Sequence, residues 1–138
     1  MESIFLTNET IRNVESDIKK VVALGNFDGL HLGHSKVIET GLALAKEKGL
    51  PLGVMSFSPH PRTVLNKQQN AFHYLMPLHE KEEKLAALGV DYFYIVEFTL
   101  DFARLLPEQF EVDYLLGVGA NHVVAGFDYK YGFKGLVR

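Results

Sequence analysis

The sequence contains no cysteine, which excludes disulfides, thiolate zinc sites and a cysteine nucleophile. It also lacks an excess of one charge, because 14 basic and 17 acidic residues give a net charge of −3. Without a basic footprint, nucleic acid is disfavoured as a main partner. No apolar run approaches the roughly 20 residues of a membrane span, and the first residues lack the order of a signal peptide. We therefore expect no membrane partner and a cytoplasmic location.

The chain shows neither an internal repeat nor a low-complexity linker, and 138 residues suit a single domain over 1–138. Apolar runs and amphipathic stretches alternate along it. The expected strands are 21–24, 52–57, 92–96 and 122–125, and the expected helices are 35–48, 78–88 and 107–116. In the second helix, Lys81 is expected on a charged face, opposite Leu85 and Leu88. This alternation predicts an α/β fold, a parallel sheet with helices on both faces, and ligands bound beyond the carboxyl ends of its strands.

The segment after the first expected strand, residues 25–34 (GNFDGLHLGH), carries the strongest functional signal. Gly25 and Gly29 let the backbone turn tightly and approach a ligand closely. The start of the next helix adds free N–H groups and the positive end of a dipole. Gly33 lets a phosphate lie against the backbone. The segment therefore predicts a phosphate site.

Two common kinds of phosphate site are disfavoured by what this segment lacks. It has no G-x-G-x-x-G, and the second expected strand ends in Phe57-Ser58 instead of an acid that would hold a ribose. These two absences disfavour a dinucleotide-dependent dehydrogenase. No G-K-[ST] is present either, which disfavours a P-loop kinase.

His31 and His34 stand where those motifs would be. Residues three apart at a helix start share one face, so both imidazoles can donate hydrogen bonds to a phosphorus centre undergoing substitution. Neither needs to act as a base, because an attacking phosphate is already ionised. Two other interpretations remain open: a pair of metal ligands, for which no third ligand is obvious, and ordinary capping or surface residues.

The segment 25–34 resembles the G-x-F-D-G-x-H-x-G-H signature of the bacterial FMN adenylyltransferase (FAD synthetase) domain, of the HxGH nucleotidyltransferase superfamily. Further motifs agree in order: 56–61 (SFSPHP), Phe98 to Phe102 followed by 106–110 (LPEQF), and 124–132 (VAGFDYKYG). The resemblance runs from about residue 21 to 132. It implies a Rossmann-like fold with a five-stranded parallel sheet whose first strand is central. The implied activity is adenylyl transfer from ATP to FMN, giving FAD and pyrophosphate, with Mg²⁺ accompanying ATP.

The resemblance also implies the site residues. The ATP-binding residues would be Gly25, Asn26, Phe27, Gly29, His31, Gly33 and His34, with His31 and His34 catalytic. The flavin-binding residues would be Phe57, Pro59, His60, Pro61 and Asp128. A rigid apolar wall suits a flat fused ring. Taken alone, Pro-His-Pro is a stiff loop and Asp128 an ordinary turn residue. No protein-held metal site is expected.

One departure limits the resemblance. Family members carry a Ser/Thr-rich segment ending in arginine, which clamps the outgoing phosphates, and a riboflavin kinase domain. Neither occurs here. We therefore expect a domain truncated at its C-terminal end and weak or absent activity of this piece alone. A non-catalytic nucleotide- or flavin-binding module stays open. So does a cytidylyltransferase-like enzyme with another phosphate acceptor, although the 56–61 segment argues against it. The sequence does not indicate an oligomeric state.

Overall fold

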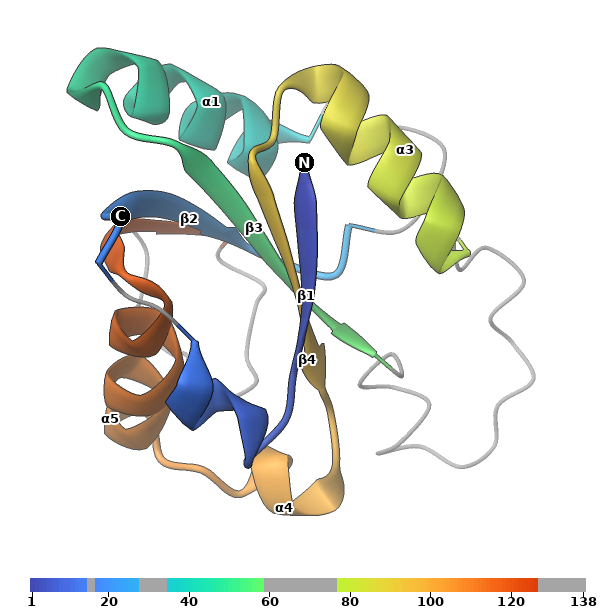
Figure 1. Ribbon diagram of the computed structural model, residues 1–138, viewed down its shortest axis with the longest axis vertical. Helices are drawn as coiled ribbons and strands as arrows, with labels where there is room; N and C mark the ends of the chain where they lie inside the picture. Colours follow the sequence, from blue (N-terminus) through green and yellow to red (C-terminus); the bar gives the residue numbers. More distant parts are fainter. Residues whose placement is uncertain (15–16, 28–34, 59–76, 127–138) are drawn as a thin grey trace.

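The computed structural model describes residues 1–14, 17–27, 35–58 and 77–126 (Figure 1). Five strands form one parallel sheet in the order β1-β4-β3-β2-β5. Their bounds are β1 Glu2–Leu6, β2 Lys20–Leu24, β3 Leu52–Ser58, β4 Tyr92–Glu97 and β5 Ala120–Ala125. The expected five-stranded parallel sheet is confirmed. The expected central place of the 21–24 strand is wrong, because β1 pairs with β4 at the far edge and makes β3 the middle strand.

Helices cover both faces of the sheet, as the alternating pattern predicted (Figure 1). One face carries α1 (Lys36–Lys48) and α3 (Leu78–Leu88). The other carries η1 (Thr10–Asn13), α4 (Leu100–Ala103), α5 (Pro107–Phe110), η3 (Glu111–Leu115) and η4 (Leu116–Val118). The single helix expected over 107–116 is therefore an α-helical turn followed by a π-helical turn, and a 3-10 turn continues to Val118.

The ends of α1 and α3 follow the local sequence. Ser35 caps α1 by accepting a hydrogen bond from the Ile38 N–H (3.4 Å). Gly49 and Gly89 end the two helices with φ of 67° and 100°, in the left-handed region that favours glycine. The expectation that Lys81 faces solvent is wrong: it is 5% exposed, on the same face as Leu85. Residues four apart share a helix face, so Lys81 lies in the buried stripe.

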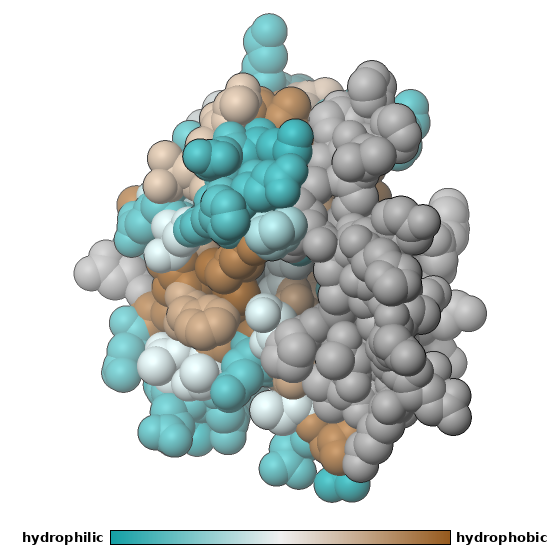
Figure 2. Space-filling model, turned by 90° about the vertical axis from the view of Figure 1, so that its right-hand side faces the viewer, coloured by the Kyte–Doolittle hydropathy of each residue, from teal (hydrophilic) through white to brown (hydrophobic). Residues whose placement is uncertain are grey.

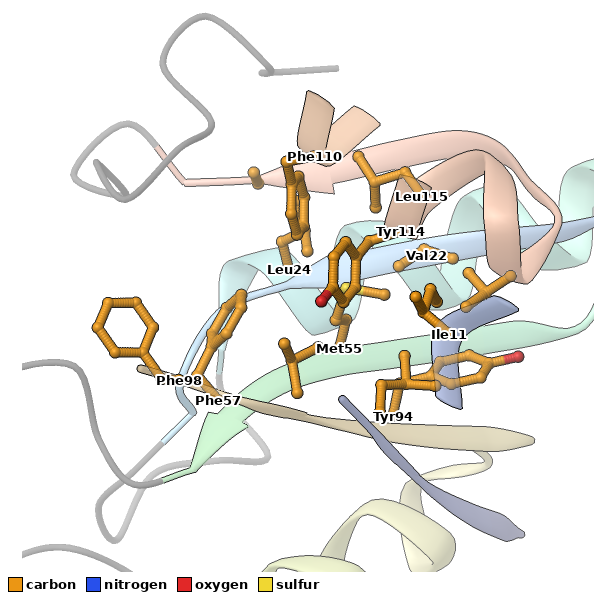
Figure 3. Close-up of a cluster of buried hydrophobic side chains, with 14 residues drawn as sticks. Ile11, Val22, Leu24, Met55, Phe57, Tyr94, Phe98, Phe110, Tyr114 and Leu115 are labelled. Atoms are coloured by element: carbon orange, nitrogen blue, oxygen red, sulfur yellow. The ribbon is translucent and has the colours of Figure 1, made fainter. Parts of the chain in front are cut away.

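Each face of the sheet has its own hydrophobic core. On the α1 and α3 side, Val21, Ala23 and Val54 of the sheet pack with Ile38 and Leu85 of the helices. The opposite core is rich in aromatic rings (Figure 3), including Phe57, Tyr94, Phe98, Phe110 and Tyr114. Apolar side chains also remain at the surface beside hydrophilic ones (Figure 2), and Phe5 on the edge strand β1 is 57% exposed. The two cores fix the sheet whose carboxyl edge forms the candidate site.

Buried tyrosines predict a loss of stability at alkaline pH. Burial raises the pKa of Tyr94 and Tyr114 above the ordinary value of 10.0, and negative neighbours add to the shift. The unfolded chain therefore releases these protons first, so their stabilising contribution is complete below about pH 10 and falls as pH rises further. Burial lowers the pKa of Lys20 from its ordinary value of 10.5. This group alone makes the free energy of unfolding rise with pH just below pH 10.5, because the unfolded chain keeps the proton longer.

The measurement is urea unfolding at a series of pH values from 8.5 to 11. We expect the free energy of unfolding to fall above about pH 10, and Tyr94→Phe to flatten part of that fall. An identical slope in Tyr94→Phe and the parent chain would contradict this assignment.

Candidate active site

The carboxyl ends of the strands place three parts of the chain at one edge of the sheet. β2 ends at Leu24 between β3 and β5, which end at Ser58 and Ala125. The Gly25 N–H extends the pairing by donating to the Met55 carbonyl (3.1 Å), and the Phe98 N–H donates to the Ser58 carbonyl (3.1 Å). In parallel α/β sheets ligands bind at this edge, so the segment after β2 begins where a ligand is expected.

The structure describes four of the predicted site residues, namely Gly25, Asn26, Phe27 and Phe57. The others lie outside the described residues: Gly29, His31, Gly33, His34, Pro59, His60, Pro61 and Asp128. The elements on both sides of 28–34 and of 59–76 are described, and β5 is described before Asp128. β2 ends at Leu24 and α1 begins at Lys36, so both histidines belong to the connection between these two elements. The roles of all twelve residues stay predictions.

Gly25 and Phe27 have different roles in the turn after β2 from those expected from the sequence. Within the described ranges, Phe27 is the one residue other than glycine with positive φ, at 54°. Its ring lies over Gly25, where an added Cβ would come within 2.7 Å of a ring carbon. The residue in the left-handed region is therefore Phe27, and Gly25 provides the space for its ring. Such a backbone conformation costs a non-glycine residue about 1–3 kcal/mol, so the surrounding structure must hold it.

Asn26 lies at the centre of a partly buried polar network. Its carbonyl accepts hydrogen bonds from Ser56 Oγ (3.1 Å) and from Lys81 Nζ (2.7 Å). Its side-chain Oδ1 is buried and has no hydrogen-bond partner in the described part of the chain. Sequence reasoning missed Lys81 and Ser56. The signal for Lys81 was its spacing of four from Leu85, which places both on one helix face.

Phe57 points into the aromatic core on the face opposite α1 and α3 (Figure 3). It is 4% exposed, and its ring centroid lies 6.1 Å from that of Phe98, 5.7 Å from Phe102 and 6.5 Å from Phe110. All four phenylalanines come from motif segments identified in the sequence. They meet as one cluster beneath the carboxyl edge, where they support Ser58 and the end of β3.

Comparisons with known proteins agree with this architecture. Residues 13–137 match the sequence profile of the family described as FAD synthetase. The chain is 47% identical over 135 residues to a bifunctional riboflavin kinase/FMN adenylyltransferase of Listeria monocytogenes and 44% identical over 135 residues to one of Bacillus subtilis. Each alignment covers 98% of this chain and 43% of the relative, so the chain spans less than half the length of these relatives.

A solved structure is similar as well. The crystal structure of a protein described as a macrolide-efflux protein from Streptococcus pneumoniae matches with a TM-score of 0.79 and 31% sequence identity. The match covers 94% of this chain and 43% of that chain. Among the residues described here, no helix is long and apolar enough to cross a membrane. The family match over nearly the whole sequence shows that the chain belongs to the FAD synthetase family.

Proposed function

We propose that this chain supplies the adenylyl-transfer site that converts ATP and FMN into FAD and pyrophosphate. The observation that carries the proposal is the position of Gly25, Asn26 and Phe27. They follow β2 at the carboxyl edge, between β3 and β5, in a chain that belongs to the FAD synthetase family. A cytoplasmic location is part of the same proposal.

In the proposed reaction a terminal phosphate oxygen of FMN attacks the α-phosphorus of ATP. The new P–O bond joins AMP to FMN, and the bond from the α-phosphorus to the oxygen bridging to the β-phosphate breaks, releasing pyrophosphate. His31 and His34 would donate hydrogen bonds to the phosphoryl oxygens as negative charge develops on them. The N-terminal end of α1, which starts at Lys36, would add backbone N–H groups and a positive dipole. The chain's main contribution would be orientation and charge stabilisation.

Asn26 supports the assignment of this segment to ATP. Buried polar atoms are normally hydrogen-bonded, and the Asn26 Oδ1 atom has no partner among the described residues. A hydrogen-bond donor of the nucleotide would satisfy it. The main-chain carbonyl of the same residue already accepts hydrogen bonds from Ser56 and Lys81. The backbone is therefore held in place, and the side-chain Oδ1 atom can still accept a hydrogen bond from a ligand.

The proposal includes Mg²⁺ bound together with ATP, where it would neutralise phosphate charge and assist departure of pyrophosphate. Within the described ranges, no group of three or more His, Cys, Asp or Glu side chains could hold a metal ion. Mg²⁺ commonly keeps several waters and binds through substrate phosphates with one or two protein oxygens. An ion held largely by ATP and water needs no such group of protein ligands.

For the flavin we propose the segment that follows β3, with Pro59, His60 and Pro61, together with Asp128 beyond β5. Phe57 was predicted in the same group. Its burial among Phe98, Phe102 and Phe110 supports a packing role at the end of β3. Direct contact of Phe57 with the flavin stays a prediction.

The test is to mix the purified chain, in excess over substrate, with ATP, Mg²⁺ and FMN and to separate the products by chromatography. Formation of FAD and pyrophosphate in equal amounts would support the proposal. Binding of ATP and FMN without turnover would instead favour a non-catalytic binding module. Product formed with a polyol phosphate but not with FMN would favour a sister nucleotidyltransferase.

A further inference from the structure

Lys81 is buried in a place where a lysine is costly. It is 5% exposed, whereas its neighbour on the same helix, Lys84, is exposed. Lysine is almost never fully buried unless its ammonium group is paired. In this chain Lys81 Nζ donates a 2.7 Å hydrogen bond to the Asn26 carbonyl, 55 residues earlier in the sequence. A charged donor makes a stronger hydrogen bond than a neutral one.

The accepting carbonyl belongs to the segment proposed to bind ATP. It lies in the peptide between Asn26 and Phe27, and Phe27 has the unfavourable positive φ. Ser56 Oγ donates to the same oxygen from β3 (3.1 Å). Two side chains from different elements therefore fix the orientation of this one peptide, which lies in the same connection between β2 and α1 as His31 and His34.

The position of α3 makes this anchor rigid. Leu85, one turn after Lys81, is fully buried in the core shared with α1 and the sheet. The helix is thus packed on the sheet by apolar contacts, and Lys81 extends from it to the end of β2. A lysine tied to a packed helix loses less freedom on forming its bond than one on a mobile segment.

We propose that Lys81 is a positioning residue, which holds the segment 25–27 in its turn through the Asn26 carbonyl so that this segment is ready to receive ATP. The inference rests on the proposed function for the identity of the ligand. The anchoring of the segment by Lys81 can be tested without any ligand.

The test compares Lys81→Met with Lys84→Met in the full chain. Both replace a lysine of α3 with an apolar side chain of similar length, but Lys84 is exposed. The first readout is hydrogen exchange of the Gly25 amide, which donates to the Met55 carbonyl. We expect about 10- to 100-fold faster exchange in Lys81→Met, the scale of one lost charged hydrogen bond. Exchange in α1 and the central strands should match that of Lys84→Met.

The second readout is the Kd for ATP, measured by calorimetry. It should increase about tenfold or more in Lys81→Met and stay unchanged in Lys84→Met. Gly25 exchange equal in the two variants would overturn the inference, and so would a rise of equal size in every strand, which indicates a general structural role. Faster Gly25 exchange in Lys81→Met, combined with no ATP binding by the parent chain, would leave the anchor in place and refute the proposed function.

If Lys81→Met does not fold, Lys81→Gln with Lys84→Gln as its control answers the same question. Glutamine stays polar but removes the charge and is too short to place a donor where the ammonium group lies. Faster local exchange at Gly25 in Lys81→Gln alone would support the inference. Exchange equal in the two glutamine variants, together with equal ATP affinity, would overturn it.

Discussion

Replacing His34 with alanine is expected to lower the rate of FAD formation by about 10²- to 10³-fold, the usual effect of removing one donor that stabilises transition-state charge. His34 lies two residues before Lys36, the first residue of α1, and the imidazole can donate a hydrogen bond to a phosphoryl oxygen. The proposed reaction involves no covalent intermediate with the protein. Removing a positioned donor should therefore lower mainly the rate of the chemical step. Single-turnover formation of FAD, with the chain in excess, measures that step.

His79→Ala is the matched control, because His79 is exposed on α3. Its rate should equal that of the parent chain. Thermal unfolding of both variants shows whether either change disturbs the fold. An undiminished rate in His34→Ala would remove this histidine from the mechanism. An equal loss in His79→Ala would point to a general effect of losing a histidine.

Replacing Phe57 with alanine is expected to destabilise the fold by about 3–5 kcal/mol, the range for removing a buried phenylalanine. The ring is 4% exposed and lies against Phe98, Phe102 and Phe110. Its removal leaves a cavity that those rings cannot fill without leaving their own positions. The free energy of unfolding in urea measures the loss.

Phe5→Ala provides the control, because Phe5 is 57% exposed on the edge strand β1; a surface change of this kind usually stays within about 0.5 kcal/mol. Phe57→Leu then separates the two roles of the ring. A core role predicts a moderate loss of stability with FMN affinity retained in the folded variant. Weaker FMN binding at full stability would show that the ring contacts the flavin. Equal destabilisation by Phe57→Ala and Phe5→Ala would contradict the packing described here.

The sequence predicted the elements whose ends are marked by local chemistry. Ser35 and Gly49 bound α1, and α3 has the predicted bounds before Gly89. β1 has no comparable signal, because only Leu6 of its five residues is buried and its place is set by pairing with β4. The face of Lys81 was predicted wrongly, since a charged side chain was assigned to solvent. Its partner, the Asn26 carbonyl, belongs to the backbone and lies 55 residues away.

Some features of the candidate site could likewise be predicted from the sequence, and others could not. The position of the 25–34 segment after a buried strand was predictable from the short apolar run and Gly25. The left-handed turn at Phe27 was not, because such a conformation is unfavourable for a bulky residue and is held by tertiary contacts. Phe57 was predicted as part of a flavin-binding wall because the segment 56–61 resembles a family motif and Pro59 and Pro61 follow closely. Its ring contacts come from Phe98, Phe102 and Phe110, more than 40 residues later.

The most direct test of the central claim follows the phosphorus atoms of ATP. The chain, in excess over substrate, is incubated with Mg²⁺, FMN and ATP labelled at either the α- or the γ-phosphate. The proposed attack on the α-phosphorus predicts that α-label enters FAD and that γ-label leaves in pyrophosphate. Transfer of γ-label to the flavin would contradict the claim, as would the absence of α-label from the flavin when ATP and FMN are both bound.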